Sequence, residues 1–304
     1  MSPYATLNKF HLRIAETNIH SPGPESLTYC LDALSEVVTL VGQDGFLSAL
    51  ARLCEAASGY DSTFITAYFD SHSPVELFDN LDDEFSDATI GPYLDFAYLL
   101  DPFYNLIRNG RHDGVVTLKD CAPDDFLTSE YYETFYVGTG LFDEANVIVP
   151  FGEGTFLSLS LGSRDEGFML SDAAREMLTA LFPCISALCK RHWPKFNPES
   201  IQGQGRIGLH LEKSFERFST SVLSQREAEI VRLILKGHSS KSIARELGNS
   251  PETVKVHRKR IHNKLGIASQ GELFSLFLDA LSQTPSNATE DPLTYLDRQV
   301  SEYD

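Results

Sequence analysis

Apolar residues recur at helical spacing throughout the C-terminal third of this 304-residue chain. Residues 225–236 carry their apolar side chains three or four positions apart, which places them on one face of a helix. The same spacing predicts further helices at 241–247 and 251–265. Three short amphipathic helices in close succession predict a compact helical module.

The residues between these helices are ones that begin and end helices. Ser224, with Glu227 three residues later, forms a capping-box pattern before the first helix. Gly237 suits the left-handed position that follows a helix. Ser250 is a favourable N-cap, and Pro251 suits the first helical position because its missing N–H is no loss there. The breaks therefore agree with the periodicity.

The helix at 251–265 has one apolar and one basic face. Lys255, Val256 and Lys259 fall opposite the core positions, and Arg258 flanks them. A helix fits the major groove of DNA, where Lys donates to guanine acceptors and an apolar side chain touches the thymine methyl group. A basic segment alone would more often be a solvated surface. Three correctly spaced helices in this order favour a DNA-binding helix-turn-helix module.

This segment resembles the C-terminal domain of the LuxR/NarL family of transcription regulators. The matching pieces are LSQREAEIVRLILKG, IARELGNS, TVKVH and KLGIAS. The resemblance implies a four-helix module that binds double-stranded DNA as a homodimer, with RNA polymerase as a further partner. It also implies base reading by Lys255, Val256 and Lys259, and phosphate contacts by Lys241, Thr253, Arg258 and Lys264. A fourth helix at about 270–281, which completes an all-α domain, is implied to form the dimer contact through Leu273, Leu276, Phe277 and Ala280.

Upstream of residue 194 the pattern alternates between two periods. Runs rich in β-branched and aromatic residues predict strands at 62–69, 75–78, 145–151 and 155–161, the last two forming a hairpin, and a short strand or loop at 115–118. Helical spacing predicts helices at 44–57, 90–100, 129–136 and 171–192, and another that begins at Pro102 with Asp101 as its cap. Helices on either side of an antiparallel sheet predict an α/β/α sandwich of the GAF or PAS type. The fold class is therefore α+β, a sandwich followed by a helical domain.

Composition indicates where the domains meet. Residues 194–208 combine two prolines and three glycines without clear periodicity, as a linker does. Their G-x-G-x-x-G run lacks the preceding strand and following helix that a dinucleotide site needs. We therefore expect a ligand-sensing or regulatory domain at 1–193, a linker at 194–208, the DNA-binding domain at 209–281 and an acidic tail at 282–304.

Charge is divided unevenly along the chain. The net charge is −18, yet residues 221–281 hold ten Lys and Arg against six Asp and Glu. The basic part attracts DNA phosphates, whereas the acidic remainder repels them. There is no apolar run of membrane-spanning length and no signal-peptide pattern, and five scattered cysteines fit free thiols. These features predict a cytoplasmic location without membrane contact.

A sandwich domain before a LuxR-type module implies a small-molecule effector. The run Tyr98-Leu99-Leu100-Asp101-Pro102 resembles acyl-homoserine-lactone-binding domains of quorum sensors, which implies that Asp101 accepts the ligand's amide N–H. The single tryptophan, Trp193, lies at the linker, so the pocket tryptophans of those receptors are missing. A small polar or cationic metabolite held by carboxylates and aromatic rings is the alternative. The candidate ligand-binding residues are Asp101, Tyr98, Tyr104, Tyr131, Tyr132 and Tyr136, with Glu144.

No motif for catalysis stands out in the sequence. There is no His/Cys cluster at metal-ligand spacing, no nucleophile elbow and no P-loop. We therefore expect no enzymatic activity, no metal and no cofactor. The sequence predicts a ligand-responsive transcription regulator. A regulator controlled by a protein partner that docks on the acidic domain, and an acyl-homoserine-lactone receptor, remain as alternatives.

Overall fold

A computed structural model describes residues 24–70, 72–110, 113–152, 154–201, 211–285 and 288–300. Its centre is a five-stranded antiparallel sheet in the order β2-β1-β5-β4-β3. The strands are β1 (Ser62–Tyr68), β2 (Val75–Asp79), β3 (Gly114–Thr117), β4 (Asp143–Gly152) and β5 (Thr155–Ser163). The four predicted strands are confirmed, the segment expected as a strand or loop at 115–118 contains strand β3, and β4 and β5 form the predicted hairpin.

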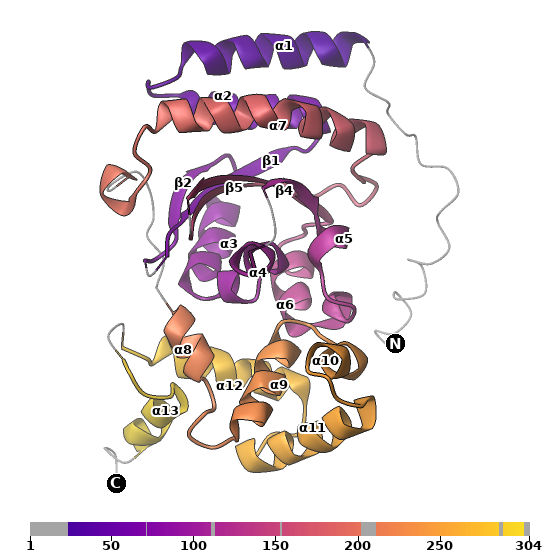
Figure 1. The fold of residues 1–304 in the computed structure, drawn as a ribbon, viewed down its shortest axis with the longest axis vertical. Coiled ribbons are helices and arrows are strands. Elements are labelled where there is room, and N and C mark those ends of the chain that lie inside the picture. The colour runs from indigo at the N-terminus through magenta and orange to yellow at the C-terminus, as the bar shows by residue number, and fades with distance from the viewer. Residues whose placement is uncertain are drawn as a thin grey trace.

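Helices cover both faces of the sheet (Figure 1). One face carries α2 (Phe46–Ser58) and α7 (Asp172–His192), with α1 (Pro24–Thr39) packed outside them. The other face carries α3 (Asp83–Asp95), α4 (Pro102–Arg108), α5 (Leu118–Cys121) and α6 (Glu130–Tyr132). We call residues 24–201 the sheet domain. Its α/β/α sandwich confirms the predicted fold class.

The two faces of the sheet differ in chemistry. On the face towards α2 and α7, the β4–β5 hairpin places Val147, Val149, Leu157 and Leu159. These side chains form an apolar core with the two helices. Because side chains alternate along a strand, the residues between them face α3–α6. Several of these are polar although they are buried: Glu144, Asn146 and Ser158 on the hairpin, and Thr66 on β1, with the half-buried Ser160 beside them. The second face therefore combines burial with polar side chains.

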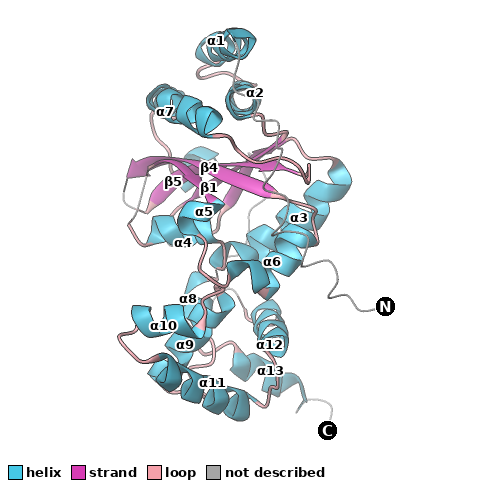
Figure 2. Cartoon of the chain, turned by 90° about the vertical axis from the view of Figure 1, so that its right-hand side faces the viewer, coloured by secondary structure: helices cyan, strands magenta, loops and turns pink. Residues whose placement is uncertain are grey.

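The C-terminal residues 211–300 form a helical domain beneath α3–α6 (Figure 2). It contains α8 (Glu212–Arg217), α9 (Gln225–Leu235), α10 (Ser240–Glu246), α11 (Pro251–Leu265), α12 (Gln270–Ser282) and α13 (Leu293–Val300). The helices predicted at 225–236, 241–247, 251–265 and 270–281 are confirmed to within a residue or so. The predicted linker lies partly outside the described residues, because 202–210 are not described.

Part of the acidic tail belongs to this domain. The Asp291 carboxylate is buried and accepts hydrogen bonds from the backbone N–H groups of Ser219 at 2.9 Å and Ser221 at 2.7 Å. Asp291 therefore holds the tail against the loop between α8 and α9.

Two predicted helices differ from the structure. The helix predicted at 90–100 is instead α3, which ends at Asp95, followed by a separate 3-10 turn at Ala97–Leu99. Pro92 inside α3 and the extended φ of Phe96 explain the break. The helix predicted at 129–136 is one short α turn continued by a π turn at Glu133–Val137. Among the described residues, no helix is long and apolar enough to cross a bilayer.

Candidate DNA-binding surface and ligand pocket

The three central helices of the helical domain begin at side-chain caps. Ser224 and Glu227 form the predicted capping box at the start of α9. Ser239 caps α10, Ser250 caps α11 ahead of Pro251, and α11 ends at a left-handed Gly266 with φ 69°. The caps fix where each helix starts, and so fix which residues of α11 face solvent.

The predicted base-reading residues share one exposed face of α11. Val254 and Ile261 are fully buried against the domain core, whereas Lys255 and Lys259 are exposed. Val256 is 51% exposed, which is unusual for a branched apolar side chain and leaves its methyl groups open to a partner. Lysines flanking an apolar residue match the chemistry of the major groove.

The predicted phosphate-contacting residues are not all free. Lys241 on α10 and Thr253 on α11 are exposed. The Lys264 ammonium instead lies 2.6 Å from the buried carboxylate of Glu227, and this contact lowers the pKa of Glu227 to about 2. The half-buried Arg258 donates to Gln270 Oε1 at 3.1 Å. In this arrangement Lys264 and Arg258 hold the domain together.

The predicted dimerisation residues of α12 lie mostly inside the chain's own core. Leu273, Phe277 and Ala280 are completely buried, and Leu276 is half-buried. The Phe277 ring packs edge-on against Phe218, with 5.2 Å between ring centroids. Of the four, Leu276 alone retains surface for a second protomer in this arrangement.

The polar face of the sheet opens on a cavity of about 90 Å³. A single buried water needs roughly 10–15 Å³, so the cavity has room for a small molecule. Strands β1, β4 and β5 form one wall, and α3, the start of α4 and the α6 region form the other. Lining residues include Phe64, Thr89, Tyr93, Asp101, Tyr131, Phe135, Tyr136, Thr139, Glu144, Ser160 and Arg164. We call this cavity the polar pocket.

The Asp101 carboxylate enters the polar pocket from the first turn of α4. Its Oδ1 accepts the Phe103 N–H at 2.7 Å, which confirms the predicted helix cap. Its Oδ2 accepts the Tyr93 hydroxyl at 2.5 Å, and the Tyr93 oxygen lies 2.6 Å from the Tyr68 hydroxyl. Burial raises the pKa of Asp101 to about 6, although these donors act in the opposite direction.

The Glu144 carboxylate enters from β4. Its Oε2 accepts the Tyr136 hydroxyl at 2.5 Å, and its Oε1 accepts the Asn146 amide at 3.0 Å. The Asn146 oxygen in turn accepts hydrogen bonds from the hydroxyls of Ser158 and Ser160. Burial, and secondly the charge of Asp101, raise the pKa of Glu144 to about 8. The pocket therefore holds two buried carboxyl groups that disfavour each other's ionisation.

The structure separates the predicted ligand residues into two groups. Asp101, Tyr131 and Tyr136 line the polar pocket together with Glu144. Tyr98, Tyr104 and Tyr132 are not part of its lining. Tyr93 and Tyr68 are not among the predicted ligand-binding residues, because their contacts with Asp101 and with each other depend on the fold. The polar positions of the hairpin strands were the available signal, since a polar residue on a buried face needs a partner.

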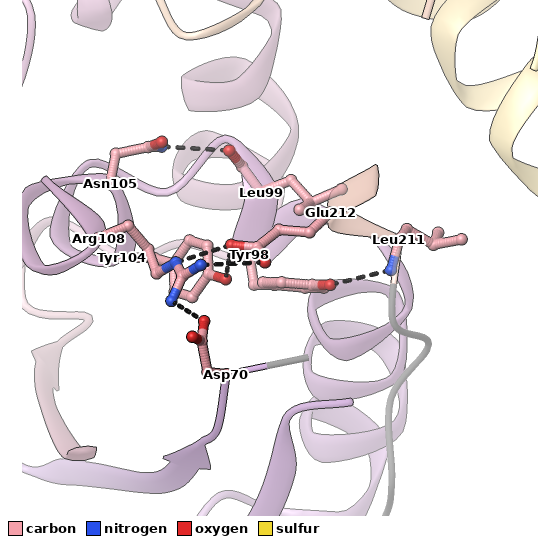
Figure 3. A network of polar contacts seen from close by, with 8 residues as sticks. All are labelled: Asp70, Tyr98, Leu99, Tyr104, Asn105, Arg108, Leu211 and Glu212. Atoms are coloured by element: carbon pink, nitrogen blue, oxygen red, sulfur yellow. Dashed lines mark hydrogen bonds and ion pairs between the residues drawn. The ribbon is translucent and has the colours of Figure 1, made fainter. Parts of the chain in front are cut away.

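Tyr98 and Tyr104 instead contact the start of the helical domain (Figure 3). The Tyr98 hydroxyl accepts the Leu211 N–H at 3.2 Å, and the Tyr104 hydroxyl donates to Glu212 at 2.7 Å. Arg108 lies 2.7 Å from both Glu212 and Asp70. Asp101 therefore caps the N-terminus of α4, and Tyr104 and Arg108 further along the same helix contact Glu212 of α8.

A second contact between the domains lies at the first helix of the helix-turn-helix pair. The Asp124 carboxylate accepts the Ser239 hydroxyl at 2.8 Å and its N–H at 3.2 Å. The Asp125 N–H donates to the Gly237 carbonyl at 3.2 Å. Gly237 has φ 84°, and a Cβ there would lie 3.1 Å from the Cα of Phe126. Asp124 and Asp125 therefore contact the residues that begin α10, and Ser239 among them lies two positions before Lys241 in the sequence.

Comparisons with known proteins agree with this geometry. Residues 221–277 match the family of bacterial regulatory proteins described as the luxR family. An HTH-type transcriptional regulator of Aeromonas salmonicida, from the region 3′ of exeN, is 34% identical over 197 residues, which is 63% of this chain and 100% of that protein. The transcriptional regulatory protein TdiR of Thauera aromatica is 44% identical over 73 residues, 24% of this chain and 32% of TdiR.

A solved structure is also similar. The LBD domain of VqsR from Pseudomonas aeruginosa is 28% identical, with a TM-score of 0.48, over 55% of this chain and 98% of that one. The similarity to the Aeromonas protein spans more residues than the helix-turn-helix segment alone, so it includes part of the sheet domain.

Proposed function

Since this chain belongs to the luxR family of bacterial regulatory proteins, we propose that it is a ligand-responsive transcription regulator. A small molecule in the polar pocket controls sequence-specific DNA binding by the helical domain. The observation that carries this proposal is the position of α4. Its first residue follows Asp101 in the pocket, and its Tyr104 and Arg108 bind Glu212 of the helical domain.

The contacts between the domains favour a docked, weakly DNA-binding state. The carboxylate of Asp124 occupies the cap of α10, next to the exposed Lys241. A DNA phosphate approaching this helix start would meet a negative charge already bound there. A ligand that shifts α4 by binding at Asp101 would loosen the contacts to Glu212 and release the helical domain. Any such ligand must bind the released state more tightly than the docked state.

On DNA, we propose that two copies of the chain bind two half-sites. The exposed face of α11 enters the major groove, with Lys255, Val256 and Lys259 at the base edges. Half-sites for such a dimer lie roughly 34 Å apart, about one turn of DNA. Leu276 of α12 is the residue of the predicted dimer surface that stays accessible in the docked arrangement.

The direct test is a selection of DNA sequences from a random library with the full-length chain. Lys255→Ala and Lys259→Ala are expected to weaken binding to the selected site by about 1–3 kcal/mol each, measured by fluorescence anisotropy at fixed salt. Lys190→Ala removes an exposed lysine of α7 and serves as the matched control. Enrichment of no sequence, or equal losses in all three variants, would remove sequence-specific binding through α11.

A protein-controlled regulator is the second candidate, and α1 favours it. Its outer surface exposes Leu27, Tyr29, Leu31 and Val38, each 49–67% exposed. Apolar side chains gathered on one helix are typical of contact surfaces between proteins. Replacing Leu31 and Val38 by Ser together is expected to abolish partner-dependent regulation under this candidate and to leave small-molecule binding unchanged under the first.

A further inference from the structure

The polar pocket contains two acidic groups that come from different layers of the fold. Asp101 is 5% exposed and enters from the helical layer, and Glu144 is 9% exposed and enters from the sheet. Both carboxyl groups belong to the lining of the polar pocket, and the charge of Asp101 acts on Glu144 in the direction that raises its pKa. Both face one cavity large enough for a small molecule.

The partners of these carboxyl groups are neutral. Asp101 is bound by the Tyr93 hydroxyl and a backbone N–H, and Glu144 by the Tyr136 hydroxyl and the Asn146 amide. Among the described residues, no Lys or Arg forms an ion pair with either group. Arg164 lines the cavity, and its Nε donates to the Thr139 carbonyl at 3.2 Å. Buried carboxylates ordinarily have a cationic partner or take up a proton.

Aromatic and hydroxyl groups elsewhere in the lining suit a positive charge. Tyr131 and Tyr136 place aromatic rings beside the carboxyl groups, and ring faces attract ammonium groups. The hydroxyl oxygen of Thr89, also in the lining, is buried and has no hydrogen-bond partner among the described residues. It supplies one more acceptor for an N–H donor.

We propose that the polar pocket binds a small organic cation, with the ligand's ammonium group between the carboxyl groups of Asp101 and Glu144. This inference rests on the proposed sensing role of the pocket and names its ligand class. An ammonium group offers three donors and a charge, so it satisfies both carboxylates at once. An amide ligand offers a single N–H, and one buried carboxyl group would remain without a cationic partner.

The test compares an amine with its neutral analogue on the full-length chain. Hexylamine and hexan-1-ol differ in the charged head group alone, and isothermal titration calorimetry at pH 7.5 measures both. Hexylamine is expected to bind at least about tenfold more tightly than hexan-1-ol. Equal affinities, or no binding of the amine, would overturn the proposal. This comparison uses the unmodified chain and does not depend on whether any variant folds.

Variants then locate the ammonium group. Asp101→Asn and Glu144→Gln are each expected to weaken hexylamine binding at least about tenfold, because each removes one carboxylate. Glu133→Gln removes an exposed charge from the neighbouring π turn and should bind hexylamine as the unmodified chain does. Unchanged affinity in Glu144→Gln, with its melting temperature retained, would exclude the bridging position.

A further arm separates this inference from the proposed function. Binding of N-hexanoyl homoserine lactone in place of hexylamine would overturn the cationic ligand and retain a ligand-sensing domain. If loosening the contacts between the domains leaves DNA affinity unchanged, the proposed regulation is overturned whatever the ligand is.

Discussion

At the scale of single residues, Asp101 and Glu144 are carboxyl groups that the fold buries. Burial disfavours the ionised form of each, and neighbouring phenols stabilise it only in part. The sequence identified Asp101 through its position before Pro102, and Tyr131 and Tyr136 through their aromatic cluster. It could not show that Glu144 and Tyr93 meet them in one pocket, because these contacts join residues from separate elements.

The raised pKa of Glu144 has a consequence for stability. The folded chain binds this proton more tightly than the unfolded chain, whose Glu144 has an ordinary pKa near 4.5. The stabilisation is fully present below that value and is lost as the pH rises towards about 8. We expect the melting temperature to fall between pH 5 and pH 8, and to fall less in Glu144→Gln. Each kcal/mol of lost unfolding free energy corresponds to a fall of roughly 2–4 °C.

Thermal unfolding at the two pH values measures this difference. Asp101, Tyr131 and Tyr136 line the polar pocket together with Glu144, and burial raises the pKa of each of them. The charged Arg164 also belongs to this lining. The raised pKa of Asp101 also makes the melting temperature fall as the pH rises, and this part of the fall remains in Glu144→Gln. Glu133→Gln should follow the unmodified chain. An identical fall in Glu144→Gln and the unmodified chain would contradict the assignment.

At the scale of elements, local signals predicted the helical domain better than the sheet domain. Helices α9 to α11 follow from caps and periodicity, both of which lie within a few residues of each helix end, and α12 follows from the family resemblance. Helix α1 was not predicted, since residues 24–39 hold several β-branched residues and bury just Cys30 and Val37. Its stability comes from packing on α2, which no local pattern indicates. The break after α3 was missed although Pro92 marked it.

Glu227 joins two of the well-predicted helices. It closes the capping box of α9 and accepts the Lys264 ammonium of α11 at 2.6 Å while 3% exposed. Glu227→Gln is expected to destabilise the chain by about 1–3 kcal/mol, because the charge-assisted hydrogen bonds that the carboxylate accepts from Lys264 and Ser224 are lost or replaced by weaker ones to a neutral amide. Urea unfolding measures the loss. Glu229→Gln, in a more exposed pair with Arg226, is the control and should cost about 1 kcal/mol or less.

At the scale of the whole molecule, the contact between the domains is the structural basis of the proposed regulation. The sequence predicted two domains and a linker between them, but it did not predict that they pack together. The surfaces that meet include Tyr98 and Tyr104, which sequence reasoning assigned to the ligand. Their real partners, Leu211 and Glu212, lie more than 100 residues away along the chain.

Loosening this contact should strengthen DNA binding without ligand. Glu212→Gln removes the charge that Arg108 binds while α8 remains intact. This ion pair is partly exposed, so it stabilises the docked state by about 1 kcal/mol or less. Its loss is therefore expected to raise DNA affinity up to roughly fivefold. Anisotropy titration with the selected DNA site measures it. Glu216→Gln, an exposed residue of the same helix, is the control. Equal affinities in the two variants would show that docking does not restrain DNA binding.

The apolar core beneath the sheet continues without interruption into the helical domain. Tyr98, Phe103 and Phe126 of the sheet domain belong to the same buried cluster as Phe215, Ile230 and Phe277. We therefore expect the docked chain to unfold in a single cooperative transition, although its sequence divides into two domains. Differential scanning calorimetry of the docked state should show one unfolding peak. Any molecule that separates the domains will first have to expose apolar surface that both of them share.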